Sequence, residues 1–174
     1  PKEKIKIIEI GCGSGTTLIK MKQKFKSNVF GLDTSKKAIN FAKEKYKLKN
    51  VYNDRFLSFK ISKKFDIVIS GGFLYVTPDK IINQTINKLI RILKKNAYLI
   101  IWDYDTPKSY LNNWKYDRKI KSYKRDLLKL VYKNNKNLYL VSKKLFIGNG
   151  IEIKHYDNGQ KIDNIFSILI FKKI

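Results

Sequence analysis

Residues 5–25 read IKIIEIGCGSGTTLIKMKQKF, an apolar run that passes through a glycine-rich turn into a helical pattern. The run predicts a strand and the pattern after the turn predicts a helix, because their apolar side chains follow the matching periods. Gly11, Gly13 and Gly15 let the backbone turn tightly, so that a ligand can lie against N–H groups at the start of the helix. The spacing Gly-x-Gly-x-Gly after Glu9 is not the dinucleotide fingerprint Gly-x-Gly-x-x-Gly, whose third glycine falls one place later.

Strands and helices alternate through the first two-thirds of the chain. Further strands are predicted at residues 28–32, 51–53, 65–70 and 97–102, and further helices after Ser35 and Pro78. Alternation of this kind favours a parallel sheet with helices on both faces.

The last third follows a different pattern. Residues 106–121 are polar and aromatic, and Ser122 is predicted to open a helix as its N-cap. Two strand-like runs, at residues 138–147 and 165–171, predict an antiparallel pair at the sheet edge. No repeat or linker divides the chain, so residues 1–174 are expected to form a single domain.

The composition is strongly basic, with 38 Lys and Arg against 14 Asp and Glu and a formal net charge of +24. A charge of this size favours a polyanionic partner such as nucleic acid. Only four of the basic residues are Arg, however, and the lysines are dispersed from Lys2 to Lys173. This distribution also fits A/T-rich codon usage and a solvated surface, so it weakens the inference of a nucleic-acid partner.

Several classes are excluded by what the chain lacks. One cysteine, Cys12, and one histidine, His155, leave no intrachain disulfide and no Cys/His zinc site, so no metal is expected. No apolar run approaches the ~20 residues of a membrane span and no leader is visible, which predicts a cytoplasmic protein without a membrane span. His155 is expected at the surface. The chain begins at Pro1, close to its first strand, which predicts that a helix before this strand is missing.

Two further acids follow predicted strands at the edge where the glycine loop lies. Asp33 ends the second strand, where a carboxylate can accept hydrogen bonds from both ribose hydroxyls. Asp54 follows the third strand, where it can face the edge of an adenine.

With these residues the sequence resembles the class I S-adenosylmethionine-dependent methyltransferases. The resemblance covers nearly the whole chain in the family's order: the acid and glycine loop, the two later acids, the segment Phe65-Asp66-Ile67-Val68-Ile69-Ser70-Gly71-Gly72 and the terminal antiparallel pair. It implies S-adenosylmethionine as the cofactor. It also implies an α/β fold, a Rossmann-like three-layer sandwich with a seven-stranded, mostly parallel sheet and an antiparallel C-terminal strand pair.

The resemblance further implies which residues bind the cofactor. These are Glu9, Gly11, Cys12, Gly13, Gly15, Asp33, Thr34, Asp54, Arg55, Ser70 and Gly71. The glycine loop would line the methionine end, with Glu9 holding the loop or the ammonium group and Ser70 and Gly71 offering carbonyls to this ammonium. Asp33 would bind ribose. A purely structural cap stays open as the role of Glu9.

The adenine end is implied in the same way. Asp54 would bind the adenine amino group, and the Arg55 N–H would lie near the ring. A surface turn stays open as the role of Asp54.

A shorter resemblance concerns the acceptor. The segments Trp102-Asp103-Tyr104-Asp105-Thr106-Pro107 and Ser122-Tyr123-Lys124-Arg125-Asp126 are similar to a bacterial methyltransferase group often linked to surface-polysaccharide or sugar biosynthesis. This similarity implies methyl transfer to a hydroxyl of a small, sugar-like or nucleotide-linked acceptor. The candidate catalytic residues are Asp103, Asp105 and Tyr75, and the candidate substrate-binding residues are Tyr104, Tyr123, Lys124 and Arg125.

Structural roles stay open for these residues as well. Asp103 or Asp105 would take the hydroxyl proton, but at most one of the two is expected to face the pocket, while the other caps the loop. Lys124 or Arg125 would hold an anionic group of the substrate. Trp114 and Tyr116 form a lid, a sugar-stacking face or a loop anchor.

Two other functions stay open. The net charge motivates RNA methylation, for which lysines would cluster around the acceptor mouth. A cofactor-binding domain without catalysis of its own fits the abrupt start at Pro1.

Overall fold

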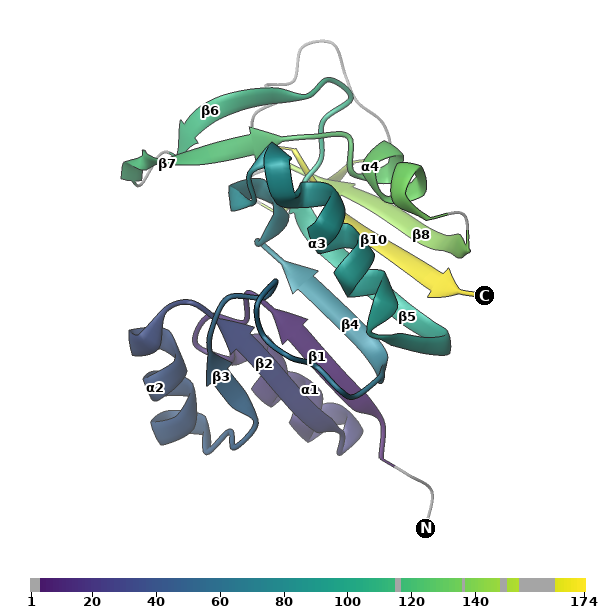
Figure 1. The fold of residues 1–174 in the computed structure, drawn as a ribbon. Coiled ribbons are helices and arrows are strands. Elements are labelled where there is room, and N and C mark those ends of the chain that lie inside the picture. The colour runs from purple at the N-terminus through teal and green to yellow at the C-terminus, as the bar shows by residue number, and fades with distance from the viewer. Residues whose placement is uncertain (1–3, 115–116, 136, 148–149, 154–164) are drawn as a thin grey trace.

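The computed structural model describes residues 4–114, 117–135, 137–147, 150–153 and 165–174, and a large mixed sheet runs through them (Figure 1). Its strands are, in spatial order, β3 (Val51–Asn53), β2 (Asn28–Asp33), β1 (Lys6–Ile10), β4 (Phe65–Gly71), β5 (Leu93–Tyr104), β10 (Phe166–Lys173), β8 (Leu138–Phe146) and β9 (Glu152–Ile153). The first five of these pair in parallel, whereas β10 runs antiparallel to both β5 and β8. The expected fold is therefore confirmed, and the two-residue β9 is added to the seven strands expected.

Helices cover both faces of this sheet. They are α1 (Thr16–Phe25), α2 (Lys36–Tyr46), α3 (Asp79–Arg91) and α4 (Leu127–Asn134), with a short 3₁₀ turn η1 (Leu74–Val76) before α3. Figure 1 shows α3 and α4 in front of the sheet and α1 behind it.

Strand β1 is buried on both faces and so divides the core in two. Ile8 and Ile10 belong to the larger cluster, which packs under α3 and α4, and Ile7 belongs to the cluster under α1 and α2. An unbroken apolar run is what a parallel strand covered by helices on both sides requires.

A β-hairpin forms where the sequence predicted a polar segment and the start of a helix. Residues 106–121 were not expected to form strands, yet β6 (Tyr110–Trp114) and β7 (Asp117–Lys124) pair as a separate antiparallel sheet. The prediction that Ser122 opens a helix is wrong, because Ser122 lies within β7 and the next helix begins at Leu127. The true N-cap is Asp126, whose carboxylate accepts a hydrogen bond from the Lys129 amide at 2.9 Å.

Two features of the sequence lie outside the described residues, namely His155 and Tyr116, and no side-chain position is described for Trp114. Within the part that is described, none of the helices has the length and apolar character needed to cross a membrane.

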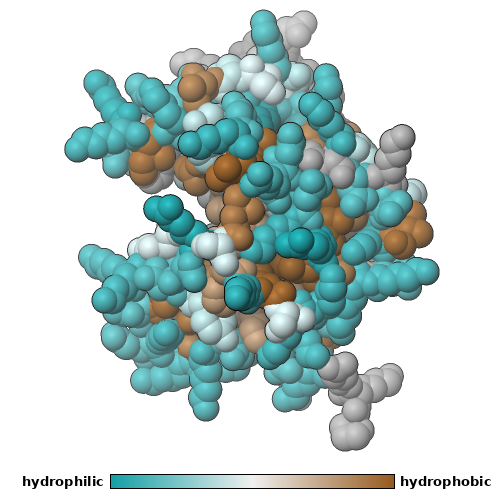
Figure 2. Space-filling model, viewed as in Figure 1, coloured by the Kyte–Doolittle hydropathy of each residue, from teal (hydrophilic) through white to brown (hydrophobic). Residues whose placement is uncertain are grey.

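The topology creates a crevice at the carboxyl end of the parallel strands. Strand β1 has β2 on one side and β4 on the other, so the strand order reverses at β1. Ligands of open α/β sheets bind at such a reversal. Figure 2 shows the surface hollowed on the left, between the part that contains the β6–β7 hairpin and the part that contains α2 and β3.

Candidate cofactor and acceptor site

The glycine loop leaves β1 at this crevice. Gly11 and Gly15 have φ angles of 76° and 77°, a left-handed conformation that glycine adopts readily. A Cβ on Gly11 would stand 2.9 Å from the Cβ of Phe73, so the loop and the segment after β4 touch across the crevice. Gly13 has a φ of 51°, and a Cβ there would meet no atom of the described residues within 4 Å, so among these residues nothing covers this part of the loop.

Asp33 ties the glycine loop to β2. Its Oδ2 accepts a hydrogen bond from the Gly13 amide at 2.8 Å, and its Oδ1 accepts one from the Ser35 amide at 2.8 Å. Each carboxylate oxygen has a second lone pair, so the group can still accept hydroxyl donors from a ligand. Its position at the end of β2 fits the ribose contact that the sequence predicts.

Glu9 is a buried acid at the inner end of the crevice, only 5% exposed. Burial raises its pKa from 4.5 to about 7, with a hydrogen bond from Thr17 opposing the shift and the charge of Asp33 adding to it. Its Oε2 atom has no hydrogen-bond partner among the described residues. A buried carboxylate oxygen left in this state fits a ligand that brings its own positive charge.

Ser70 and Gly71 end β4 beside Glu9. Ser70 is fully buried and its Oγ likewise has no hydrogen-bond partner among the described residues. A Cβ on Gly71 would stand 3.5 Å from Oε1 of Glu9 and 3.2 Å from the ring of Trp102. The Glu9 Oε2 therefore lies at the end of the site where the resemblance puts the cofactor ammonium, and this residue fits that group. Ser70 pairs with Ile10 and directs its side chain to the other face of the sheet, so its backbone carbonyl, not its hydroxyl, is the group available to the ammonium.

The outer end of the site is formed by the turn after β3. Asp54 is exposed and its Oδ1 accepts hydrogen bonds from the Arg55 amide at 2.6 Å and the Ser58 hydroxyl at 3.5 Å. The Asp54 amide donates to the Asp33 carbonyl at 3.1 Å, which holds the two acids on one edge. Asp54 caps its own turn, and whether it also binds adenine stays a prediction.

Two adjoining cavities follow this row of residues. The smaller, of about 170 Å³, is lined by residues that include Gly11, Asp33 and Asp54, and the larger, of about 600 Å³, lies against Arg55 and α3. Four residues line both cavities, namely Thr34, Phe56, Phe73 and Val76. Sequence reasoning missed the last three, although each follows a predicted site motif within a few residues.

The thiol of Cys12 is not a nucleophile in this site. It is 6% exposed, and burial together with the charges of Glu9 and Asp33 raises its pKa to about 12. A thiol in this state is inert at neutral pH, so Cys12 serves the loop as a small apolar side chain.

Both candidate bases on β5 bind backbone amides. Asp103 is 3% exposed, and it accepts hydrogen bonds from the amides of Leu74 at 2.7 Å, Tyr75 at 3.2 Å and Tyr104 at 2.8 Å. Burial raises its pKa to about 6, while the amide hydrogen bonds oppose the shift. This carboxylate thus caps η1.

Asp105 is also buried, at 1% exposed. It accepts a hydrogen bond from the Leu127 amide at 3.0 Å and forms an ion pair with Lys143 at 2.7 Å. Asp103 and Asp105 do not alternate, because residues two apart in an extended segment share a face, and both are buried. That at most one of them faces the acceptor pocket stays a prediction. A catalytic role for either residue stays a prediction.

Arg125 binds groups within the protein. It is 6% exposed, and its guanidinium donates to the carbonyls of Leu74 at 2.8 Å and Thr77 at 2.7 Å and to Asp79 at 2.7 and 2.9 Å. These bonds hold η1 and the start of α3. The geometry favours a positioning role for Arg125 over the substrate contact that the sequence predicts.

Lys124 and Tyr123 lie at the same end of the hairpin. Lys124 is 6% exposed with its ammonium 2.8 Å from the ring centroid of Tyr104, and the Arg125 guanidinium lies 4.7 Å from the ring centroid of Tyr123. The structure therefore brings Lys124 and Tyr104 together. Tyr123, Lys124 and Arg125 also line a cavity of about 370 Å³ that contacts Asp79 at the start of α3.

Aromatic rings gather where Gly71 leaves β4. Tyr75 packs edge-on against Tyr104 with ring centroids 5.4 Å apart, and Trp102 and Tyr104 both contact Phe166 at about 6 Å. Trp102 is 48% exposed even though it adjoins Gly71. In the sequence, Trp102 stands out only as part of a motif. Its position one residue before Asp103, and so on the opposite face of β5, was the signal that could have identified it.

Comparison with known proteins agrees with this geometry. Residues 1–168 match a family model described as a methyltransferase domain. The ubiquinone biosynthesis O-methyltransferase of Pelagibacter ubique is 35% identical over 118 residues, which is 64% of this chain and 47% of that protein. The chain spans 40% to 47% of the length of the curated relatives it matches.

Solved structures share the fold. A S-adenosylmethionine-dependent methyltransferase from Methanosarcina mazei has a TM-score of 0.73 at 17% identity, covering 100% of this chain and 94% of that one. The N-methyltransferase NodS from Bradyrhizobium japonicum WM9, solved with S-adenosylhomocysteine, has a TM-score of 0.66 at 16% identity, covering 98% of this chain and 79% of that one. With the family model matching nearly its whole length, the chain belongs to the class I S-adenosylmethionine-dependent methyltransferases.

Proposed function

We propose that this chain transfers a methyl group from S-adenosylmethionine to a hydroxyl of a small acceptor that is sugar-like or nucleotide-linked. The observation that carries the proposal is the half-exposed Trp102 beside Gly71, at the end of the crevice where Glu9 and Ser70 lie. An exposed aromatic ring next to the cofactor end provides a flat apolar surface for an acceptor, with polar groups nearby to orient it.

The cofactor supplies an electrophilic methyl on a sulfonium, and the protein's task is to hold both reactants in line. Glu9, Asp33 and the glycine loop would hold the cofactor. Tyr75, Tyr104 and Trp102 would hold the acceptor above it. Because Phe73 touches the glycine loop, η1 forms a common wall for both ligands.

Asp103 is the candidate base on β5, and its pKa of about 6 suits this role. It is 3% exposed and lies on the face of β5 opposite Trp102, so its carboxylate would have to release the amides of η1 to reach the acceptor. In this role kcat/KM would fall as pH drops below about 6, since the protonated acid cannot accept a proton. The profile is measured for the native enzyme and for Asp103→Asn, with circular dichroism to confirm folding. If the acid limb persists in Asp103→Asn, another group is the base and Asp103 only positions η1.

Transfer of labelled methyl to a panel of sugars, nucleotide sugars and phenols tests the acceptor class. Trp102→Ala is expected to lower kcat/KM at least tenfold while the Kd for S-adenosylhomocysteine, measured by calorimetry, changes less than threefold. Tyr139→Ala is the control, because Tyr139 is 63% exposed on β8, two strands from β5. Absence of heat with either form of the cofactor would contradict the proposal, whereas heat without transfer to any acceptor would favour a cofactor-binding domain without catalysis of its own.

Methylation of RNA is the second candidate. The observation that favours it is the β6–β7 hairpin, which stands at the top of Figure 1 and whose strand β7 has exposed cations. They are Arg118, Lys119 and Lys121, and the exposed Lys108 precedes β6. Label incorporated into RNA rather than into any small molecule would favour this reading.

A further inference from the structure

A second pair of cavities lies on the face that α3 covers, beside the cofactor crevice, whose larger cavity shares Leu57 and Ser58 with one of them. The segment of residues 59–63 lies between them and lines both. One cavity, of about 110 Å³, faces β1, β2 and β3, and the other, of about 480 Å³, faces the end of α3. The proposed methyl transfer uses neither.

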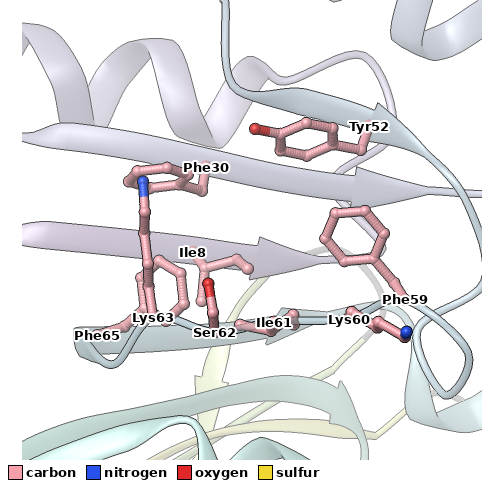
Figure 3. A pocket seen from close by; sticks show the side chains of 9 residues that line it. All are labelled: Ile8, Phe30, Tyr52, Phe59, Lys60, Ile61, Ser62, Lys63 and Phe65. Atoms are coloured by element: carbon pink, nitrogen blue, oxygen red, sulfur yellow. The ribbon is translucent and has the colours of Figure 1, made fainter.

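The first cavity is aromatic. Phe30, Tyr52 and Phe59 surround it, with Lys60 and Lys63 at its two ends (Figure 3). The Tyr52 and Phe59 rings lie 5.1 Å apart at 37°, and Tyr52 is 40% exposed. The Lys63 ammonium lies 5.1 Å from the ring centroid of Phe30. A tyrosine ring left accessible between two lysines is a stacking surface for a planar, negatively charged ligand.

The second cavity is cationic. Its lining includes five basic side chains and no carboxylate: Lys60, Lys63, Lys64, Lys88 and Arg91. Lys88 is only 8% exposed, and burial together with the charge of Arg91 lowers its pKa. Its ammonium donates to the carbonyls of Phe56, Leu57 and Phe59, which fixes the start of the segment.

This arrangement differs from lysines scattered on a solvated helix. The like charges converge on a concave surface, where they raise one another's energy, and an anion bound there would relieve the repulsion. Lys88 and Lys64 already donate to backbone carbonyls, so Lys60, Lys63 and Arg91 are the groups exposed for a ligand.

We propose that the two cavities together bind an unpaired nucleotide of single-stranded RNA, with its base on Tyr52 and its phosphates between Lys60, Lys63 and Arg91. Aromatic stacking accepts any base, and phosphate contacts carry no sequence information, so the binding is independent of sequence. The inference goes beyond the proposed methyl transfer, because it holds whatever the acceptor is.

The test is fluorescence anisotropy with a labelled ten-nucleotide oligouridylate over a range of salt concentrations. Lys60→Gln/Lys63→Gln/Arg91→Gln is expected to weaken binding at least tenfold and to flatten the salt dependence by about two units of slope. The control, Lys20→Gln/Lys22→Gln/Lys43→Gln, removes the same charge from exposed positions on α1 and α2 and is expected to stay within twofold. Equal losses in both triple variants would overturn the proposal, because net charge alone would then explain binding.

Two further arms test the stacking. Tyr52→Leu is expected to weaken RNA binding at least fivefold without changing the salt slope. If it has no effect and tripolyphosphate competes as well as the RNA, the site binds anions only and the proposal fails. Double-stranded RNA bound as tightly as the single strand would also overturn it.

A measurement on the unaltered chain covers the case in which a variant does not fold. Crosslinking of RNA that contains 4-thiouridine, mapped by mass spectrometry, is expected to mark peptides with Tyr52 and residues 59–63. Crosslinks confined to the β6–β7 hairpin would overturn the proposal and point to the crevice mouth instead.

Discussion

Glu9 is a buried acid whose ionisation is set by what lies beside it. Without a cationic ligand its pKa is about 7 against an ordinary 4.5, so the folded chain holds a proton there that the unfolded chain has lost. Stability of the free protein should therefore fall as pH rises from about 4.5 to about 7 and then level off, by about 3 kcal/mol at most.

Glu9→Gln removes the part of this dependence that comes from Glu9, whereas the part from Asp103, whose pKa is about 6, remains below about pH 6. The variant is expected to be more stable than the native chain at pH 8, to match it near pH 4.5, and to bind S-adenosylmethionine at least tenfold more weakly. Urea unfolding at several pH values and calorimetry with the cofactor measure the two effects. Unchanged cofactor affinity would mean that Glu9 only caps the loop.

Arg125 is a positioning residue whose loss should be felt in both stability and binding. Arg125→Ala leaves the carbonyls of Leu74 and Thr77 without their donor, which costs about 2–4 kcal/mol of unfolding free energy. Because η1 forms a wall of the crevice, the cofactor Kd should rise as well. Arg118→Ala, at an exposed position of the hairpin, is the control and should change stability by less than ~0.5 kcal/mol.

At this scale the sequence predicted where side chains lie better than what they bind. Glu9 and Asp33 were found because a strand followed by a turn places its last residues at the sheet edge. Asp103 and Arg125 were predicted to face a substrate, but they bind backbone groups of η1. Nothing in the sequence marks η1 as the partner, since these bonds join residues nearly 30 and about 50 positions apart.

Among the elements, the start of α4 shows which of two candidate N-cap residues, Ser122 or Asp126, begins the helix. Asp126→Ala removes the N-cap and should cost about 1 kcal/mol, whereas Ser122→Ala should be neutral or slightly stabilising, because the Ser122 Oγ is buried without a partner among the described residues. Urea unfolding of both variants measures the difference. A loss at Ser122 equal to that at Asp126 would contradict the assignment.

The hairpin was missed for a related reason. Residues 117–121 of β7 are all exposed, so no alternation of apolar and polar side chains marks the strand. Strands β1 and β4 were predicted because burial on two faces demands unbroken apolar runs. Elements that pack on the core thus leave a pattern in the sequence, and an element that stands away from it leaves little.

For the whole molecule, the net charge of +24 is the dominant electrostatic fact. With 38 basic and 14 acidic residues, most cations cannot be paired, so their mutual repulsion opposes the compact state.

Raising NaCl from ~10 mM to ~500 mM screens this repulsion and should stabilise the chain by roughly 1 kcal/mol, or a few degrees in Tm. Thermal unfolding in NaCl and in Na₂SO₄ at equal ionic strength measures the effect. Sulfate stabilises folded proteins more than chloride even without a specific site, because it is excluded from their surface. If the cations near α3 hold an anion, this excess should be smaller in Lys60→Gln/Lys63→Gln/Arg91→Gln than in Lys20→Gln/Lys22→Gln/Lys43→Gln. A Tm that falls with NaCl would instead mean that ion pairs such as Lys94–Asp66 and Lys143–Asp105 outweigh the repulsion of the unpaired lysines.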